Sequence, residues 1–139
     1  MHDDSRGAAT PAERIIDQMA DALIYSDRDG TIRRWNQGAQ QLFGFSAAEA
    51  LGQSLDLIIP ENLRAAHWRG FHAAVQGGHT RLNGRPTLTR ALHRDGHKLY
   101  VEMSFALVTD AEAVVGSVAV ARDVTEKVER DKAARQAAS

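Results

Sequence analysis

Residues 22–35 read ALIYSDRDGTIRRW. Two short apolar runs flank the sequence Asp27-Arg28-Asp29-Gly30, a turn whose glycine can adopt a positive φ. The pattern predicts a β-hairpin with strands at Ala22 to Ser26 and Thr31 to Trp35. This hairpin begins the expected sheet, and the segments on either side of it are expected to supply helices.

A helix is predicted immediately before the hairpin. Thr10 is typical of an N-cap, Pro11 of the first helical position, and Glu13 of the residue that closes a capping box. The helix is expected to run to about Asp21. Residues 1–9 are polar and small, and we expect them to be disordered or to have been added for expression.

After the hairpin the chain is predicted to form short helices. Asn36 can cap the first one, and Ser46 with Glu49 forms a second capping box. The apolar residues of segment 55–59 are expected to be buried. A longer helix is predicted from Glu61 to about Val75, because glycines follow it.

The C-terminal part of the chain alternates with a period of two. Strands are predicted at about 81–93, 97–108 and 114–122, and a charged helix at 126–138. Two hairpin regions around a helical insert give an α+β fold, namely a five-stranded antiparallel sheet with the short helices and one longer helix on one face.

The composition limits the possible functions. The 139 residues suffice for one core, and 17 basic against 18 acidic side chains give a net charge of -1, which does not favour nucleic-acid binding. The absence of cysteine excludes disulfides, thiolate metal ligands and cysteine nucleophiles. No apolar run approaches the ~18 residues that a membrane span needs, and no signal-peptide core is present, so a cytoplasmic location is expected.

Several quoted segments together resemble the PAS family over roughly residues 12–128. They are DALIYSDRDGTIRRWNQGAQQLFGFSAAEALGQSL, LIIPENLR, HRDGHKLYVEMSFAL and VAVARDVTEK, in this order. The resemblance implies a sensor core at 22–123 that holds a small ligand between the longer helix and the sheet. It also implies flanking connector helices at 10–21 and 124–139, which relay a signal to an effector domain in a longer protein and support a homodimer together with the sheet.

Within this family, IPENLRAAH followed by RALHRDG resembles the haem-binding subset of FixL-like oxygen-sensor kinases and the oxygen-sensing phosphodiesterase of enteric bacteria. His67 precedes Asp95 by 28 residues, the spacing of the haem-ligand histidine in both. The resemblance implies that His67 is the proximal ligand of haem b, and that the domain senses a diatomic gas or a redox state.

The residues around His67 agree with a pocket position. Helical spacing places one set of residues on the apolar face turned toward the sheet: Leu63, Ala66, His67, Gly70, Phe71 and Ala74. The small Ala66 and Gly70 are expected to leave a flat slot beside the imidazole, where a planar ring can lie. The alternative interpretation is a core histidine bonded to a backbone carbonyl.

The strand at 97–108 is expected to form the opposite wall of the pocket. Period-two counting places five apolar side chains on one face: Leu99, Val101, Met103, Phe105 and Leu107. The resemblance places Met103 and Phe105 in the distal pocket. Met103 is interpreted either as a sixth iron ligand through its thioether or as core filling.

The polar residues of the pocket depart from the resemblance. Thr87 stands where the FixL-like sensors have the arginine that binds oxygen, and Arg85 where the phosphodiesterase has its methionine ligand, so the sequence does not select among oxygen, carbon monoxide and nitric oxide. Arg85 can reach the pocket through a bulge before Pro86 or can be a solvated edge residue. Arg81 is matched to a propionate contact. Other basic candidates near the pocket mouth, each equally interpretable as surface, are Arg64, Arg69 and His79.

Two alternatives remain open at the sequence level. One is a PAS domain that binds flavin, without the reactive cysteine of the flavin photosensors, or a small metabolite; another is a ligand-free dimerisation module. An enzyme is not expected, because no carboxylate pair, nucleophile elbow or phosphate loop is present at a useful spacing. His72, His93 and His97 are interpreted as surface residues.

Overall fold

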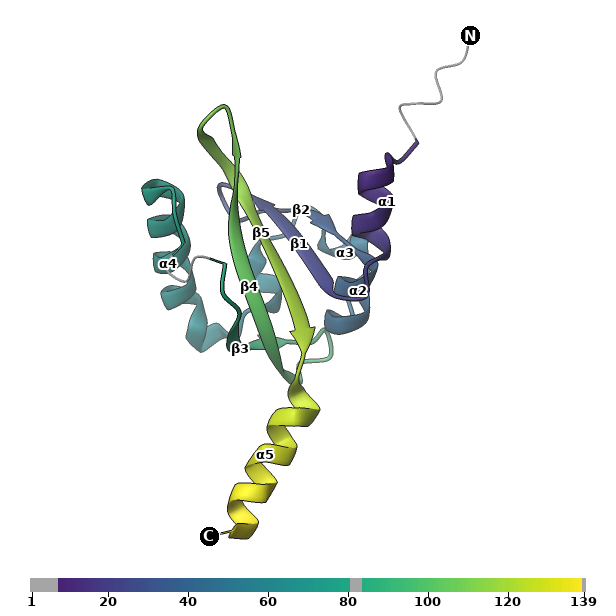
Figure 1. Ribbon diagram of the computed structural model, residues 1–139, viewed down its shortest axis with the longest axis vertical. Coiled ribbons are helices and arrows are strands. Elements are labelled where there is room, and N and C mark those ends of the chain that lie inside the picture. The colour runs from purple at the N-terminus through teal and green to yellow at the C-terminus, as the bar shows by residue number, and fades with distance from the viewer. Residues whose placement is uncertain (1–7, 81–83, 139) are drawn as a thin grey trace.

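A computed structural model describes residues 8–80 and 84–138. The elements appear in Figure 1. The helices are α1 (Pro11–Gln18), α2 (Gln37–Phe43), α3 (Ala47–Ala50), α4 (Arg64–Gly77) and α5 (Thr125–Ala138), with 3-10 turns at Leu55–Ile58 and Glu61–Leu63. The strands are β1 (Ala22–Asp27), β2 (Ile32–Trp35), β3 (Thr87–Leu92), β4 (Lys98–Asp110) and β5 (Ala113–Asp123). The expected α+β architecture is confirmed.

The five strands form one antiparallel sheet in the order β2-β1-β5-β4-β3. Residues directly opposite each other in such a sheet point to the same face. One row of paired residues crosses four strands, and its members are Trp35, Ile24, Ala119 and Phe105. A second row consists of Ala22, Ala121, Met103 and Thr87.

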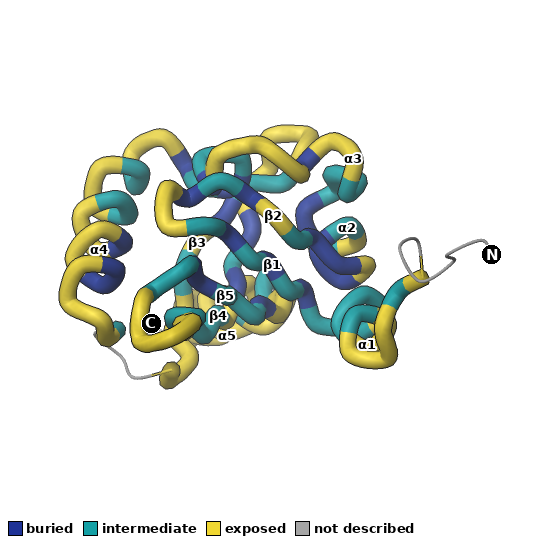
Figure 2. Tube along the Cα trace, turned by 90° about the horizontal axis from the view of Figure 1, so that it is seen from above, coloured by how far each residue is buried: buried dark blue, intermediate teal, exposed yellow. Residues whose placement is uncertain are grey.

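These rows mark the inner face of the sheet. Trp35 packs against Phe43 of α2, and Phe105 packs against Phe71 of α4, so both helices cover the same face. Viewed from above, buried residues gather where α2 and the inner side of α4 face the sheet, whereas the outer turns of α4 are exposed (Figure 2). The expected burial of segment 55–59 holds for Leu55 and Ile58, and the rest of the segment is half-buried.

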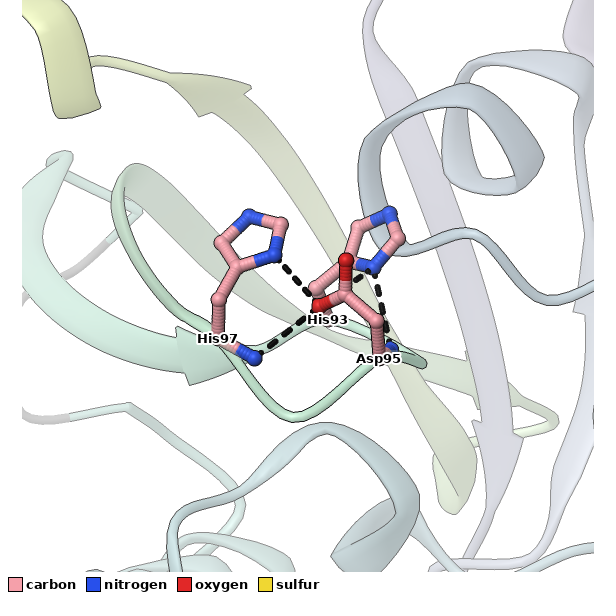
Figure 3. Close-up of side chains that lie close together, drawn as sticks. All are labelled: His93, Asp95 and His97. Atoms are coloured by element: carbon pink, nitrogen blue, oxygen red, sulfur yellow. Dashed lines mark hydrogen bonds and ion pairs between the residues drawn. The ribbon is translucent and has the colours of Figure 1, made fainter.

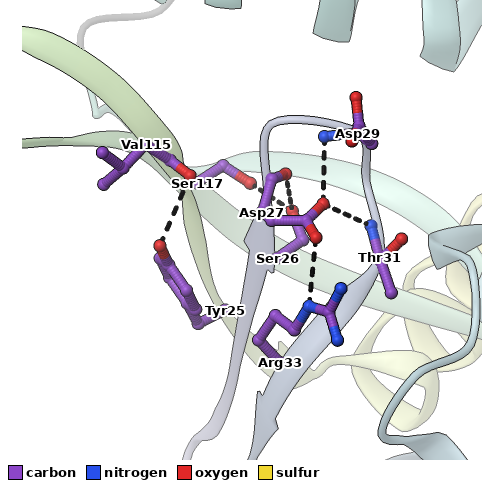
Figure 4. A network of polar contacts seen from close by, with 8 residues as sticks. All are labelled: Tyr25, Ser26, Asp27, Asp29, Thr31, Arg33, Val115 and Ser117. Carbon is purple, nitrogen blue, oxygen red and sulfur yellow. Dashed lines mark hydrogen bonds and ion pairs between the residues drawn. The ribbon is translucent and has the colours of Figure 1, made fainter.

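The turn of the first hairpin is organised by one carboxylate (Figure 4). Asp27 Oδ1 accepts hydrogen bonds from the backbone N–H groups of Asp29 (3.0 Å) and Thr31 (3.1 Å), and Asp27 Oδ2 accepts one from Arg33 Nε (3.0 Å). Burial opposes the ionisation of Asp27, but these hydrogen bonds outweigh burial and hold its pKa below its ordinary value. The local turn chemistry therefore fixes the hairpin that the sequence predicts.

Both predicted capping boxes are present, at Thr10 with Glu13 and at Ser46 with Glu49. Asn36 caps α2 as expected, but it also connects three elements. Its amide oxygen accepts from the backbone N–H groups of Leu23 (2.8 Å) and Ala39 (2.9 Å). Its amide nitrogen donates to the carbonyls of Ile16 (2.8 Å) and Asp21 (3.0 Å). The end of α1 is thereby tied to β1 and α2.

Helix α5 directly follows β5 and extends away from the sheet (Figure 1). The Thr125 hydroxyl accepts a hydrogen bond from the backbone N–H of Tyr100 at 2.9 Å. Further along α5, Lys132 Nζ lies 2.6 Å from the Tyr100 hydroxyl and 4.6 Å from the centre of its ring. Both flanking helices therefore contact the sheet directly. No helix within the described ranges is long and apolar enough to cross a membrane.

Three elements have other boundaries than predicted. The strand expected at 81–93 begins only at Thr87, because Pro86 has no N–H to donate and Gly84 adopts a φ of 79°. Residues 81–83 lie outside the described residues. The longer helix begins at Arg64 after a 3-10 turn and ends at Gly77, and α1 ends at Gln18, earlier than expected. The expectation for residues 1–9 falls largely outside the described range.

Candidate functional site

His67 lies on α4, and its imidazole is half-buried among aromatic rings. The ring of Trp68 meets it edge-on with centroids 4.7 Å apart, and the ring of Phe71, one turn later, lies 5.9 Å away. Phe71 is itself only 3% exposed and packs on Phe105 of β4 at 6.3 Å. The imidazole therefore lies on the side of α4 that the sequence predicts to face inward.

The imidazole is neutral and keeps an unused nitrogen inside the protein. His67 Nδ1 is buried and has no hydrogen-bond partner, the one such side-chain atom among residues 8–80 and 84–138. Burial lowers the pKa of His67; the Asp56 carboxylate opposes this shift, and His72 adds to it. The alternative interpretation was a core histidine bonded to a backbone carbonyl, and His67 Nδ1 makes no such bond. Imidazole in its neutral form is a ligand that suits iron, zinc and copper.

Trp68 joins α4 to two neighbouring segments. Its Nε1 donates to Asp56 Oδ1 at 2.8 Å. Its ring edge lies so close to Gly30 that a Cβ there would be 2.2 Å from Trp68 Cη2. Gly30 also has a φ of 82°, so only glycine suits this turn. The hairpin turn and α4 are thus in direct contact beside His67.

The opposite wall is the inner face of β4, as predicted. Leu99 and Val101 are buried, and Met103, Phe105 and Leu107 are half-buried against the core. Thr87 pairs with Met103, so the two side chains point to the same inner face at the end of β3. The site therefore combines an imidazole from α4, apolar and aromatic side chains from the sheet, and one hydroxyl at the rim.

The prediction that Ala66 and Gly70 lie on the buried face of α4 is wrong. Ala66 and Gly70 are exposed, and a Cβ added at Gly70 would meet nothing within 4 Å. The buried residues of α4 are Phe71, Ala74 and Val75. The inward face is therefore rotated away from Ala66 and Gly70, and Leu63, which lies in the preceding 3-10 turn, is half-buried.

The structure brings few of the predicted polar contacts to this site. Thr87 is exposed, and Arg85 is exposed and precedes β3, whose pairing with β4 contains no bulge. Arg81 lies outside the described residues. Arg64 instead donates from Nε to the carbonyl of Ile59 at 3.0 Å. The other two basic candidates, Arg69 and His79, are exposed.

A pocket of about 410 Å³ lies elsewhere, lined by residues of α1, β2, α2 and α3. Its two arginines already form ion pairs, Arg33 with Asp27 at 3.0 Å and Arg34 with Glu13 at 2.8 Å. We do not assign it as the ligand site, because its charged side chains are engaged in holding α1 and the hairpin. Its lining consists of Asp17, Arg33, Arg34, Trp35, Asn36, Gln37, Gln40, Ala47 and Leu51.

Comparisons with known proteins agree with the geometry. The family described as PAS fold matches residues 12–124. The chain is 27% identical over 118 residues to the oxygen sensor protein DosP of Escherichia coli, covering 85% of this chain and 14% of DosP. It is 36% identical over 62 residues to the sensor protein FixL of Bradyrhizobium diazoefficiens, covering 45% of this chain and 12% of FixL. The chain thus spans a small part of the length of these relatives.

Solved structures share the same architecture. The PAS domain of a protein from Colwellia psychrerythraea superposes with a TM-score of 0.71 at 25% identity, covering 81% of this chain and 93% of that one. An RNA-binding light-oxygen-voltage receptor superposes with a TM-score of 0.70 at 26% identity, covering 90% of this chain and 35% of the receptor.

Proposed function

The chain belongs to the PAS family, and from this membership we propose that it is a sensory domain that binds haem b through His67. The observation that carries the proposal is the His67 imidazole, which is neutral, faces inward and has a buried Nδ1 without a hydrogen-bond partner. Similarity to the oxygen sensor protein DosP and the sensor protein FixL supports it. When bound, haem supplies an iron that takes a diatomic ligand or changes its oxidation state.

Different residues of the chain have different roles in such a site. His67 offers a lone pair without first having to lose a proton, because burial keeps the ring neutral. Phe71, Val101 and Phe105 exclude water and lower the local dielectric, which strengthens electrostatic interactions within the site. Trp68 and Gly30 hold α4 at a fixed distance from the hairpin turn.

Met103 and Thr87 are the described residues that we assign to the distal side. They are cross-strand partners on the inner face, a thioether beside a hydroxyl. Met103 is the candidate for a sixth iron ligand, and Thr87 is the hydrogen-bond donor nearest to it in the sheet register. Arg81 and Arg85 remain candidates for contacts with propionates or the ligand.

We further propose that the domain is not an enzyme and acts through its flanking helices. Helix α1 is tied by Asn36 to β1 and α2, whereas α5 is tied by Thr125 and Lys132 to Tyr100 of β4, so α5 is the connector in direct contact with β4. The partners that this arrangement fits are a second copy of the domain and an effector domain in a longer protein.

The test is an absorption spectrum of the purified chain after addition of haem. We expect a Soret band in the wild type that is lost in His67→Ala. His72→Ala is the matched control, because His72 lies on the same helix but is exposed, and its Soret band should be unchanged. A band that persists in His67→Ala, or no band in the wild type, would overturn the haem proposal. Flavin absorption in the purified protein would favour a flavin-binding PAS domain instead.

A second spectrum tests the distal assignment. If Met103 is the sixth ligand, the ferrous wild type should be six-coordinate and Met103→Ala five-coordinate. Identical ferrous spectra in the two proteins would reject this role and leave Met103 as core filling.

A further inference from the structure

We propose that the hairpin between β3 and β4 binds a divalent transition-metal ion through His93, Asp95 and His97. This site is independent of His67. Imidazole nitrogens with one carboxylate oxygen are a donor set that suits Zn²⁺, and also Ni²⁺ and Cu²⁺. We take Zn²⁺ as the expected ion, because it accepts three protein ligands and fills its remaining coordination with water.

The three side chains already converge on one point (Figure 3). One ligand atom from each residue lies within 4.8 Å of those from the other two. His93 Nδ1 is 3.2 Å from Asp95 Oδ1, and His97 Nδ1 contacts the same oxygen. Two ligands of a tetrahedral zinc ion stand roughly 3 to 3.5 Å apart, given metal-to-ligand bonds of about 2.0–2.2 Å. Small rotations of the side chains are therefore enough to form the site.

The backbone of the turn produces this convergence. The backbone N–H of His93 donates to the carbonyl of His97 at 3.0 Å, and Gly96 donates to the carbonyl of His93 at 2.9 Å. Gly96 adopts a φ of 92°, which closes the turn. The His93 and His97 rings consequently stack with centroids 4.5 Å apart and planes 20° apart. Asp95 lies between them in the sequence and places its carboxylate against both rings.

The candidate ligand atoms are engaged in hydrogen bonds that a bound ion would replace. The backbone N–H of Asp95 donates to His93 Nδ1 at 3.2 Å, so this nitrogen presents its lone pair toward the turn rather than a proton. The one cation inside the turn, Arg94, points elsewhere and pairs with Glu49 of α3 at 2.8 Å.

The site is also anchored on the helical layer. A Cβ at Gly44 would lie 2.5 Å from His93 Cε1, so the His93 ring rests directly on the end of α2. The backbone N–H of Arg94 donates to the carbonyl of Phe43 at 2.8 Å. These contacts hold His93 before any ion arrives, which reduces the entropy that metal binding must overcome. His97 and Asp95 are exposed, so an ion can enter from solvent.

The test is calorimetric titration of ZnCl₂ into the tag-free, EDTA-treated chain. We expect one equivalent to bind, with an affinity that falls about tenfold or more in His97→Ala. His97 is the variant of choice because its ring is exposed, whereas replacing His93 would also disturb the contact with Gly44. Asp95→Asn should weaken binding similarly. The control is His79→Ala, an exposed histidine at the end of α4, which should bind Zn²⁺ like the wild type.

A second probe reads the ligands directly. Co²⁺ in place of Zn²⁺ should give visible absorption bands whose intensity reports a low coordination number. His97→Ala should lose these bands but keep the circular dichroism spectrum of the wild type. The proposal is overturned if the wild type binds no Zn²⁺, or if Zn²⁺ binding survives in His97→Ala and Asp95→Asn. Retention of Zn²⁺ binding in His67→Ala is expected, which keeps this site separate from the haem proposal.

Discussion

Helix α4 and the β3–β4 hairpin each present a histidine that can bind a metal, in opposite surroundings. His67 is packed between aromatic rings, has a buried nitrogen without a partner, and has a pKa lowered by burial. His97 is exposed and its ring is hydrogen-bonded to a carboxylate. In the first region, His67 has a buried nitrogen without a hydrogen bond, and such an unsatisfied group lowers the stability of the fold. In the second region, the candidate ligand atoms are hydrogen-bonded, and a bound ion would replace those hydrogen bonds.

The largest expected effect is in the aromatic region around His67. Phe71→Ala removes a ring that is 3% exposed and contacts His67, Trp68 and Phe105. The cavity should lower the free energy of unfolding by about 3–5 kcal/mol, measured by urea denaturation. The matched control is Leu88→Ala, since this side chain on β3 is 57% exposed and should cost less than about 0.5 kcal/mol. Equal effects in the two variants would contradict the assignment of α4 to the core.

Two glycines give the next contrast within the same region. In Gly30→Ala the new methyl would collide with the Trp68 ring at a φ of 82°, so we expect a loss of about 2 kcal/mol or more and a displaced α4. In Gly70→Ala the new methyl meets nothing within 4 Å. Because alanine favours the helix more than glycine does, this change should raise the free energy of unfolding by roughly 0.5–1 kcal/mol. Thermal unfolding of both variants measures the difference. Destabilisation by Gly70→Ala would mean that this face of α4 is covered.

The pH dependence of stability distinguishes the buried histidine from the exposed ones. The folded-state pKa of His67 is lowered, so the unfolded chain binds more protons and the free energy of unfolding falls as pH drops below about 6.5. His67→Phe should remove this slope, whereas His72→Ala should keep it. The variants should share a second loss below about pH 4, where Asp27, whose folded pKa is also lowered, takes up its proton. Urea denaturation at successive pH values measures both. An unchanged slope in His67→Phe would contradict the burial of the ring.

The sequence was most informative where structure is set by neighbouring residues. The first hairpin and both capping boxes follow from short-range hydrogen bonds around Asp27, Thr10 and Ser46, and the predicted boundaries agree within a residue or two. The inner face of β4 was predicted because a period of two leaves only two choices. Helix α4 is weakly amphipathic, so its sequence does not define the buried face sharply. The buried face is rotated slightly about the helix axis from the predicted one, which leaves Gly70 outside and His67 inside.

The candidate metal site at His93, Asp95 and His97 could not be predicted from the period of a strand or helix. Residues 93, 95 and 97 alternate, which is the one signal in the sequence, but a hairpin turn lies between them and breaks the period of the strands. Their convergence depends on the positive φ of Gly96 and on the stacking of two rings. The partners of Trp68 and the fourfold hydrogen bonding of Asn36 were likewise missed, since both join residues far apart in the sequence.

The smallest expected effect tests how much the hairpin depends on its outer contacts. Glu49→Gln removes the ion pair with Arg94, whose guanidinium side chain is 56% exposed, and should change the free energy of unfolding by no more than about 0.5 kcal/mol. Because Arg94 is then free to turn toward the ligand cluster, Zn²⁺ affinity should fall slightly, by less than about threefold on electrostatic grounds. Calorimetric titration at low and high salt measures this, and the difference should vanish at high salt. A large loss of Zn²⁺ binding that salt does not reduce would mean that Glu49 positions the hairpin itself, and that the anchoring through Phe43 and Gly44 is insufficient.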